Sequence, residues 1–390
     1  MEVPAFNTLN VRADFLDFNL KYIYYIGLWP IKEVSNKKRF LYGLYNCLLF
    51  IFAFLFILST GVGLYNSKND IIFFLLNVDK VIVSYNYILK TVVFINNRRY
   101  IRILIHDILY SGDQITDERK GMMKYFVFVV FGGSFFVAGG FQIQAQMNGE
   151  LTLDTWFPFD PSKSIWLILL GNTIIGAVFL FSFNCRGLAI KGLVCSIAMY
   201  ITDQLIELQK RLKSLNYTKD NETNTRKELK EIIQKHIRII GYAKATKEGF
   251  QEYFLIQNLA VTTELCLNAL LMSIVGFEQK KLLLNFLAFL TLALFNSYIY
   301  CYLGNELMDQ SVGIAQAAYE SNWTSWPLDM QKDLLIIITV SQRGVTLSAG
   351  GISTLSMRTF AEIAVSNNFT KLTNDFWVIY EYLNDVVTII

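Results

Sequence analysis

The residue types that most often carry catalysis or hold metal ions are few and scattered in this chain. The five cysteines mostly lie inside or beside apolar segments, none spaced as a pair, and the two histidines, His106 and His236, stand far apart in charged stretches. This spacing indicates neither a disulfide framework nor a metal site. No HExxH motif, Walker loop or nucleophile elbow occurs. We therefore expect a protein that is not an enzyme and uses no cofactor or metal ion.

Charged residues inside long apolar segments are the next candidates for function. Asp79, Lys80 and Glu264 lie in such segments, and ionisable groups at membrane depth commonly serve a function. Asp79 and Lys80 are adjacent in the sequence and therefore do not share a helix face. We expect them near the outer mouth of a water-filled vestibule; the alternative is that they snorkel or pair for structure. Glu264 lies deeper, and the sequence assigns it no partner.

A row of hydroxyl side chains marks the last apolar region. Ser356, Thr359, Ser366, Thr370 and Thr373 recur at steps of three, seven, four and three residues, which keeps them near one helix face. Polar residues in a membrane helix face the bundle interior or water. We interpret the row as the lining of a pore; a helix–helix contact through small residues is the alternative.

The elements that position these residues are expected to be membrane helices. Hydrophobic residues make up 53% of the 390 residues and charged residues only 17%, against about 25% charged in soluble domains. A net charge of +3 gives no indication of a nucleic-acid partner. The first residues lack the apolar stretch of a cleavable signal peptide, so internal segments are expected to insert into the membrane.

Six segments have the roughly 20 apolar residues that a helix needs to cross a membrane: 40–60, 71–95, 125–141, 165–185, 254–277 and 282–303. The last region, 334–390, is too long for one span. Because glycine pairs break helices, we expect a break near Ala349-Gly350-Gly351, with a cytosolic or buried part before it and a membrane part after it. The predicted fold class is an all-α integral membrane protein with seven transmembrane helices.

The distribution of basic residues predicts the orientation. The connections 1–39, 96–124, 186–253 and 304–343 hold 27 of the 35 Lys and Arg residues, and the opposite connections hold four. Because basic loops stay in the cytosol, the amino terminus is expected inside and the carboxyl terminus outside. From 186 to 215 and from 225 to 249, apolar residues recur at three-to-four spacing among charges, which predicts long cytosolic helices that bury these stripes against each other or a partner subunit.

The carboxyl-terminal third carries a specific pattern. Residues 300–323 read YCYLGNELMDQSVGIAQAAYESNW, and residues 334–363 read LLIIITVSQRGVTLSAGGISTLSMRTFAEI. This order is similar to the end of insect odorant receptors over roughly 65 residues. The positions that match the family's motif are Gly304-Asn305-Glu306, Ala318-Tyr319, Trp323, Gln342-Arg343, Leu347-Ser348-Ala349-Gly350, Leu355-Ser356 and Thr359-Phe360. After Ile363 the chain departs from the family's usual ending, so the later pore residues have no counterpart in the motif.

The resemblance implies a function and a division of the chain. It implies an odour-tuned subunit of a ligand-gated, non-selective cation channel, assembled with a shared co-receptor as a heterotetramer in the plasma membrane of olfactory sensory neurons. The short second cytosolic loop favours the tuned subunit over the co-receptor. The expected parts are a cytosolic or re-entrant segment (1–39), helices one to four (40–185), cytosolic extensions (186–253), helices five and six (254–303), a cytosolic anchor region (304–349), and a pore-lining seventh helix with an extracellular tail (350–390).

Two other receptor classes are the alternatives. A gustatory-type receptor channel would share the inverted architecture, but its usual Thr-Tyr…Gln-Phe ending is not found here. A G-protein-coupled receptor would have the opposite orientation, and the chain lacks its Asp-Arg-Tyr and Asn-Pro-x-x-Tyr motifs. A transporter or membrane enzyme would need paired acids or an inverted repeat, and neither is evident.

The family resemblance places the odorant pocket in the outer half of the bundle, among the second, third, fourth and sixth spans. A small volatile ester, terpene or aromatic offers few hydrogen bonds, so burial of apolar surface is expected to supply most of its affinity. The alternative for each aromatic is that it packs against lipid or a neighbouring helix. The candidates at this depth are Phe73, Phe74, Asn77, Phe131, Phe135, Phe136, Thr173, Ile174, Phe289 and Ala293.

Overall fold

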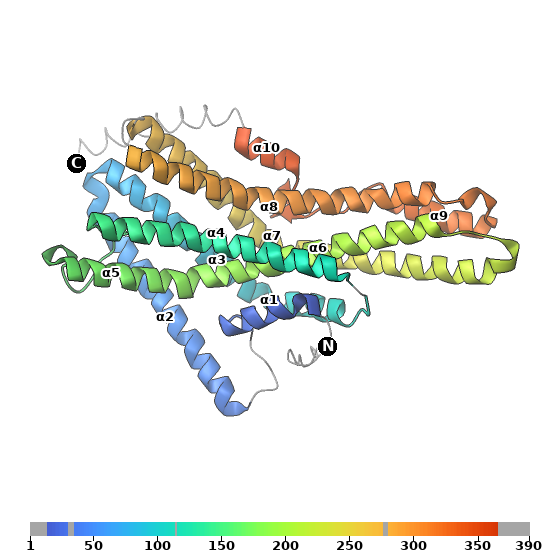
Figure 1. Cartoon of the computed structure of the whole chain (residues 1–390), viewed down its shortest axis with the longest axis horizontal. Helices are drawn as coiled ribbons and strands as arrows, with labels where there is room; N and C mark the ends of the chain where they lie inside the picture. The colour runs from blue at the N-terminus through green and yellow to red at the C-terminus, as the bar shows by residue number, and fades with distance from the viewer. Residues whose placement is uncertain (1–13, 30–34, 114, 276–279, 366–390) are drawn as a thin grey trace.

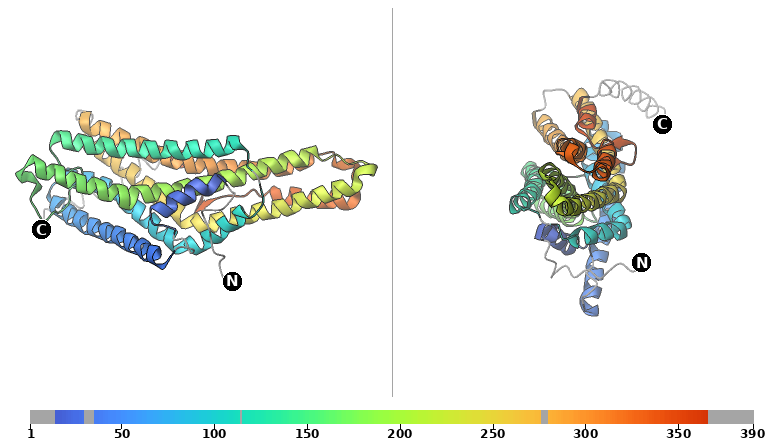
Figure 2. Two further views of the ribbon diagram at one scale, coloured as in Figure 1. Left: turned by 60° about the horizontal axis from the view of Figure 1, so that its bottom comes forward. Right: turned by 90° about the vertical axis from the view of Figure 1, so that its right-hand side faces the viewer.

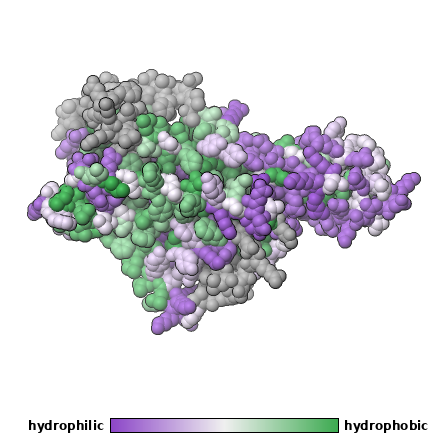
Figure 3. All heavy atoms as spheres, in the orientation of Figure 1, coloured by the Kyte–Doolittle hydropathy of each residue, from purple (hydrophilic) through white to green (hydrophobic). Residues whose placement is uncertain are grey.

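The computed structural model describes residues 14–29, 35–113, 115–275 and 280–365. In these ranges the chain forms long helices gathered into a broad body, from which a narrower extension projects on the right of Figure 1. Figure 3 shows hydrophobic surface over much of the body and hydrophilic surface over the extension. This division is what a helical membrane protein with a large water-exposed part requires, and it agrees with the predicted all-α class.

The first helices of the body follow the predicted apolar segments and run beyond them. Their bounds, with two short 3-10 turns, are α2 (Asn36–Asn66), η1 (Ser67–Asn69), α3 (Ile71–Leu109), α4 (Asp117–Asn148), η2 (Pro161–Lys163) and α5 (Ile165–Val178). Local chemistry sets the ends: the Asp70 carboxylate accepts the backbone N–H groups of Ile72 and Phe73 at 3.1 Å. Gly149 ends α4 in the left-handed conformation, with φ of 66°.

The extension is formed by helices that continue out of the body. The helix of α5 passes through a π-helical segment, η3 (Phe179–Asn184), into α6 (Cys185–Ser214), and the chain returns through η4 (Lys219–Asn221) into α7 (Glu222–Val275). The apolar stripe of α7 is largely buried as expected, with Leu229 and Ile232 inside, whereas Ile237 is 65% exposed. The stripe therefore packs mainly within the chain.

The second pair in the extension is α8 (Lys280–Tyr319) and α9 (Leu328–Ser341), joined through η5 (Trp323–Ser325). Arg226 of α7 forms an ion pair with Asp329 at the start of α9, and the guanidinium holds the pKa of the Asp329 carboxyl below its usual range. This contact ties the two pairs together near the tip of the extension.

Five described helical stretches are long and apolar enough to cross a membrane by length and composition: Asn36–Asn69, Ile71–Leu109, Asp117–Asn148, Ile165–Ser214 and Lys219–Leu271. The sixth predicted segment, 282–303, lies in α8, and some of its side chains fall outside the described residues. In Figure 1 and in the right-hand view of Figure 2, α2 diverges from the other helices at its first end. Many apolar side chains of α2 are correspondingly exposed.

A short helix before the first span packs into the middle of the bundle. Helix α1 (Asp14–Tyr25) lies against α6, and Asn19 donates a hydrogen bond from Nδ2 to Ser196 Oγ at 2.8 Å. Leu16, Leu20 and Ile23 are buried in the same core cluster as α6. Part of the predicted amino-terminal segment is thus built into the fold.

The break in the last region is a small hairpin. Strands β1 (Ser348–Ala349) and β2 (Ser353–Thr354) pair antiparallel, with Ser348 opposite Thr354 and Ala349 opposite Ser353. Gly350 and Gly351 have φ of 60° and 73°, a left-handed conformation that favours glycine. The helix α10 (Met357–Val365) begins after the hairpin, so the glycine pair separates α9 from α10.

Gly304 and Asn305 of α8 contact the segment that follows this hairpin. A side chain added at Gly304 would place its Cβ 2.4 Å from the backbone oxygen of Leu355. Asn305 Oδ1 accepts the backbone N–H of Met357 at 3.4 Å. The pair therefore lets the segment before α10 lie directly on α8.

Candidate functional site

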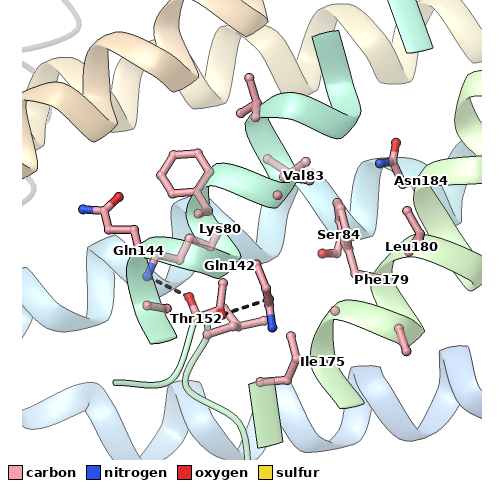
Figure 4. Close-up of a pocket in the computed structure, with 18 of the residues that line it drawn as sticks. Lys80, Val83, Ser84, Gln142, Gln144, Thr152, Ile175, Phe179, Leu180 and Asn184 are labelled. Atoms are coloured by element: carbon pink, nitrogen blue, oxygen red, sulfur yellow. Dashed lines mark hydrogen bonds between the residues drawn. The ribbon is translucent and has the colours of Figure 1, made fainter. Parts of the chain in front are cut away.

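A cavity of about 590 Å³ lies inside the body, between α3, α4, the connection after α4, and the continuous helix of α5 and η3. Figure 4 shows it with some of its lining residues as sticks. Phe56 of α2 and Leu292 of α8 complete its wall. Ligand pockets for small molecules are usually about 300–1,000 Å³, so the cavity has the size of a site for one small organic molecule.

Most of the wall is apolar, and it comes from two helices. The apolar lining includes Phe135, Val137, Ala138, Phe141, Ile175 and Phe179. Phe179 packs edge-on against Tyr87 of α3, with ring centroids 6.3 Å apart. Gly176 gives room to the amide of Gln142, because a Cβ there would lie 3.2 Å from Gln142 Cδ. Such a wall binds a ligand mainly by removing apolar surface from water.

One end of the cavity is closed by a hydrogen-bonded group of polar residues. Thr152 donates from its backbone N to Asn172 Oδ1 at 2.8 Å and from Oγ1 to Gln142 Oε1 at 3.1 Å. Gln142 Nε2 donates to the backbone oxygen of Asn172. Asn172 Nδ2 donates to the backbone oxygen of Glu150 at 2.9 Å. The connection after α4 is therefore fixed across this end by side chains that already have partners.

Lys80 reaches the same end from α3 and is the one cation among the described lining residues. Its Nζ donates to the backbone oxygen of Thr152 at 3.0 Å. In the nearby connection, burial raises the pKa of the Asp154 carboxyl, while a hydrogen bond from Asn77 and the Lys80 ammonium act in the opposite direction. Lys80 thus brings a positive charge to a site whose lining also includes the acidic residue Glu150.

Asp79 is adjacent to Lys80 but is not among the residues that line the cavity. It is 3% exposed, and Asn268 of α7 donates to Asp79 Oδ1 at 3.2 Å. Asn268 also donates to the backbone oxygen of Glu264 at 2.7 Å, which places Glu264 on the same side of α3. Asp79 therefore lies in the interior of the chain, between α3 and α7.

Two of the ten predicted ligand residues, Phe135 and Thr173, line the cavity. Asn77 is buried close by, where its Oδ1 accepts the backbone N–H of Asp154 at 3.3 Å. Phe73 is exposed and Phe74 half-buried at the start of α3. Of these five residues, only Phe135 and Thr173 face the cavity.

The remaining predicted residues lie on other faces. Phe136 is 83% exposed and Ile174 is also exposed. Phe131 packs against Tyr22 of α1, with ring centroids 4.8 Å apart. Ala293 is buried in a cluster of α7 and α8, and the side chain of Phe289 lies outside the described residues.

Several lining residues were not predicted as ligand residues, among them Lys80, Gln142 and Asn184. Gln142 lies one residue beyond the predicted third span, and Asn184 is at the end of the predicted fourth. A usable signal was present, because both are amide side chains at the border of charge-free apolar runs.

The predicted pore row is only partly described. Ser356 Oγ accepts the backbone N–H of Thr359 at 3.2 Å, and Thr359 Oγ1 donates to the backbone oxygen of Thr354 at 2.7 Å. Both hydroxyls thus bond within the start of α10. Ser366, Thr370 and Thr373 lie outside the described residues.

Comparison with known proteins gives consistent results. The family described as 7tm Odorant receptor matches residues 70–366. Odorant receptor 30a of Drosophila melanogaster is 26% identical over 190 residues, covering 48% of this chain and 49% of that protein. Odorant receptor 22c of the same species is 21% identical over 367 residues, covering 83% and 87%. An odorant receptor coreceptor of Aedes aegypti is 24% identical over 152 residues, covering 37% and 30%.

For the first two curated relatives, the match spans about half the length of the relative. The fold is similar to that of the olfactory receptor OR5 from Machilis hrabei, solved in complex with eugenol. The TM-score is 0.75 at 14% identity, and the alignment covers 96% of this chain and all of that one. A second structure of the same receptor gives a TM-score of 0.72, with 94% of this chain and 99% of that one covered. At this identity the likeness establishes the helical arrangement.

Proposed function

This chain belongs to the 7tm Odorant receptor family, and on that premise we propose that it is the odorant-binding subunit of a ligand-gated, non-selective cation channel. The observation that carries the proposal is the apolar cavity of about 590 Å³ among α3, α4 and the α5–η3 helix. Its size suits one small volatile molecule, and its wall supplies apolar contacts. The expectation that the chain is not an enzyme agrees with membership of a family of channels.

We propose that the subunit assembles with an olfactory co-receptor into a heterotetramer in the plasma membrane of olfactory sensory neurons. The extension supports this, because its helix α9 exposes the apolar side chains of Leu335, Ile336 and Val340. Exposed apolar groups on an otherwise hydrophilic part commonly mark a protein interface. A relative among the matches is itself named a coreceptor, which supports this kind of partner.

We expect co-expression with a co-receptor to increase surface receptor and odorant-evoked current several-fold, because the α9 surface is then covered. Cells expressing the chain alone and cells expressing both subunits would be compared by surface biotinylation and by currents to a panel of volatiles. Replacing Leu335 and Ile336 together by serine should abolish the gain. Tyr110, exposed at the end of α3, provides the control as Tyr110→Ser. Equal currents with and without co-receptor would contradict the assembly proposal.

We also propose seven transmembrane helices with the amino terminus in the cytosol. The support is the basic connections on one side, with 27 of 35 Lys and Arg residues. The hydrophilic extension formed by α6 to α9 lies on this side.

An epitope at the amino terminus should accordingly be labelled only after permeabilisation, and one at the carboxyl terminus also in intact cells. The reason is the charge asymmetry, because translocating basic connections is unfavourable. Immunofluorescence on intact and permeabilised cells measures both sites. An epitope placed in the 219–221 turn is a further control, expected to be labelled only after permeabilisation. Labelling of this epitope in intact cells would contradict the proposed topology.

A further inference from the structure

One face of α3 forms part of the cavity wall. Lys80, Val83, Ser84 and Tyr87 all line the cavity, and residues spaced by three and four share one face of a helix. Figure 4 shows Lys80 beside Thr152, at the end of the cavity that the polar residues close. The Lys80 side chain therefore brings an ammonium group to a wall that is otherwise mainly apolar.

The Lys80 ammonium has more hydrogen-bond donors than the described chain uses. An ammonium carries three N–H donors, and one of them binds the backbone oxygen of Thr152 at 3.0 Å. Lys80 forms no ion pair and no second hydrogen bond within the described ranges. It is half-buried, and a charged group that is shielded from water is unfavourable unless it is paired. A ligand oxygen at this end of the cavity would complete its bonding.

Other polar groups of the lining are weaker donors. The neutral lining residues that also form no side-chain hydrogen bond with the described chain are Ser84, Ser134, Gln144, Gln146, Asn148 and Asn184. The amides of α4 are half-buried or exposed, so water can bond them. A serine hydroxyl can rotate to bond the preceding turn of its own helix, and Asn184 is only 1% exposed. Because a charged donor bonds roughly twice as strongly as a neutral one, we expect Lys80 to contribute most.

The acids near Lys80 decide which charge the ligand can carry. Glu150 also lines the cavity, and the carboxylates of Glu150 and Asp154 both lie close enough to act on the Lys80 ammonium through their charge. Two carboxylates beside one ammonium leave no net positive charge, so a ligand carboxylate would be repelled. A neutral carbonyl oxygen accepts a hydrogen bond without adding a charge.

We propose that Lys80 Nζ donates a hydrogen bond to a carbonyl oxygen of the ligand, so that the cavity prefers neutral ketones, aldehydes and esters over hydrocarbons of the same shape. This inference deepens the proposed odorant-binding function and rests on it. A site built to hydrogen-bond a polar group of its ligand discriminates against an analogue that lacks this group. The apolar wall of the cavity binds the hydrocarbon part of the molecule, and the ammonium fixes which end faces Thr152.

The test records currents from the full chain with its co-receptor, beginning with acetophenone, menthone and cyclohexanone. Each compound is paired with the analogue in which a methylene group replaces the carbonyl oxygen. Wild-type channels should respond to the active carbonyl compounds at about tenfold lower half-maximal concentration than to their analogues, because only the former bond the charged donor. In Lys80→Met, which keeps a similar length without donor or charge, this ratio should fall to about one. Sensitivity to the carbonyl compounds should fall, and sensitivity to the analogues should not.

Thr173→Val is the matched control. The single proton of the Thr173 hydroxyl is donated to the backbone oxygen of Leu169 at 2.8 Å, so it is not available to a carbonyl ligand, and the ratio should equal that of wild type. Ser84→Ala removes the nearest neutral donor on the same face of α3 and should also keep the ratio. Lys80→Gln, which retains a neutral donor, serves if the methionine variant fails to reach the surface, and it should keep only part of the preference.

Equal wild-type responses within the pairs would overturn the inference, as would activation by hydrocarbons but by no carbonyl compound. An unchanged ratio in both Lys80 variants, or its loss in Ser84→Ala alone, would remove Lys80 from the assignment. A lower half-maximal concentration for benzoate than for acetophenone would overturn the preference for neutral ligands. The proposed function would fail separately, if no volatile in a broad panel evoked current in wild-type channels.

Discussion

Replacing Gly304 by alanine should leave little of the receptor at the cell surface. The new Cβ would lie 2.4 Å from the backbone oxygen of Leu355 and 3.1 Å from its backbone carbon. Because backbone atoms cannot rotate away as a side chain would, either α8 or the segment before α10 must move. Overpacking of this kind commonly costs about 1–3 kcal/mol and sometimes more. Surface biotinylation and the thermal stability of the purified protein would measure the loss.

Gly241→Ala is the matched control for this prediction. Gly241 lies in α7, and an added Cβ would have no atom within 4 Å. Alanine in an open helix position stabilises the helix slightly, by about 0.5–1 kcal/mol relative to glycine. Surface level and stability should therefore be maintained. If Gly304→Ala behaved like Gly241→Ala, the close packing of α8 on the hairpin exit would not be needed for folding.

The second large effect is expected at Phe135, on ligand sensitivity rather than on folding. Phe135 lines the cavity, and removing its ring would take away apolar contact with the ligand. By analogy with large-to-small changes in a core, the loss is about 1–3 kcal/mol. At about 1.4 kcal/mol per tenfold, Phe135→Ala should raise the half-maximal odorant concentration by about ten- to a hundredfold. Concentration–response curves with the best volatile would measure it.

The next residue along the chain supplies the control. Phe136 is 83% exposed and points away from the cavity, so Phe136→Ala removes the same side chain from a face that the ligand does not meet. The half-maximal odorant concentration of Phe136→Ala should stay within about twofold of wild type, because the substitution removes no apolar contact with the ligand. Surface level is measured for both variants. A similar loss of sensitivity at both positions would indicate general destabilisation and would place the ligand elsewhere.

The overall helix pattern could be predicted from the sequence because it depends on local composition. Charge-free runs such as 40–60 and 165–185 become helices since no other form satisfies their backbone in a membrane. The apolar stripe of α7 could be read from its spacing, and Leu229 and Ile232 are buried in it. The lengths were less predictable. Helix α3 continues past residue 95 to Leu109, where the charged pair Arg98-Arg99 ends the apolar run. An apolar stripe at helical spacing carries the helix on, and its residues Ile101, Leu104, Ile105 and Ile108 are buried.

The direction in which individual side chains point from their helix could not be predicted in the same way. In α4 the phenylalanines at 135 and 136 stand in a segment that is apolar on every side, so there is no polar face from which to set the rotation. The charges of α3 show a second limit. Lys80 donates a hydrogen bond to the backbone oxygen of Thr152, and Asp79 accepts one from Asn268. Both partners lie far away in the sequence. Local pattern could mark these charges as unusual but could not supply their partners.

The π-helical segment Phe179–Asn184 also has a consequence for how the gene can vary. An α-helix turns by roughly 100° per residue, and a π turn accommodates one residue more than an α turn. The segment thereby sets the rotational offset between α5, which turns Ile175 toward the cavity, and α6, whose Leu193 and Ile197 are fully buried. Deleting a single residue here would rotate one helix against the other. Substitutions in this segment can therefore change what the wall recognises, whereas length changes would disrupt the wall and the core together.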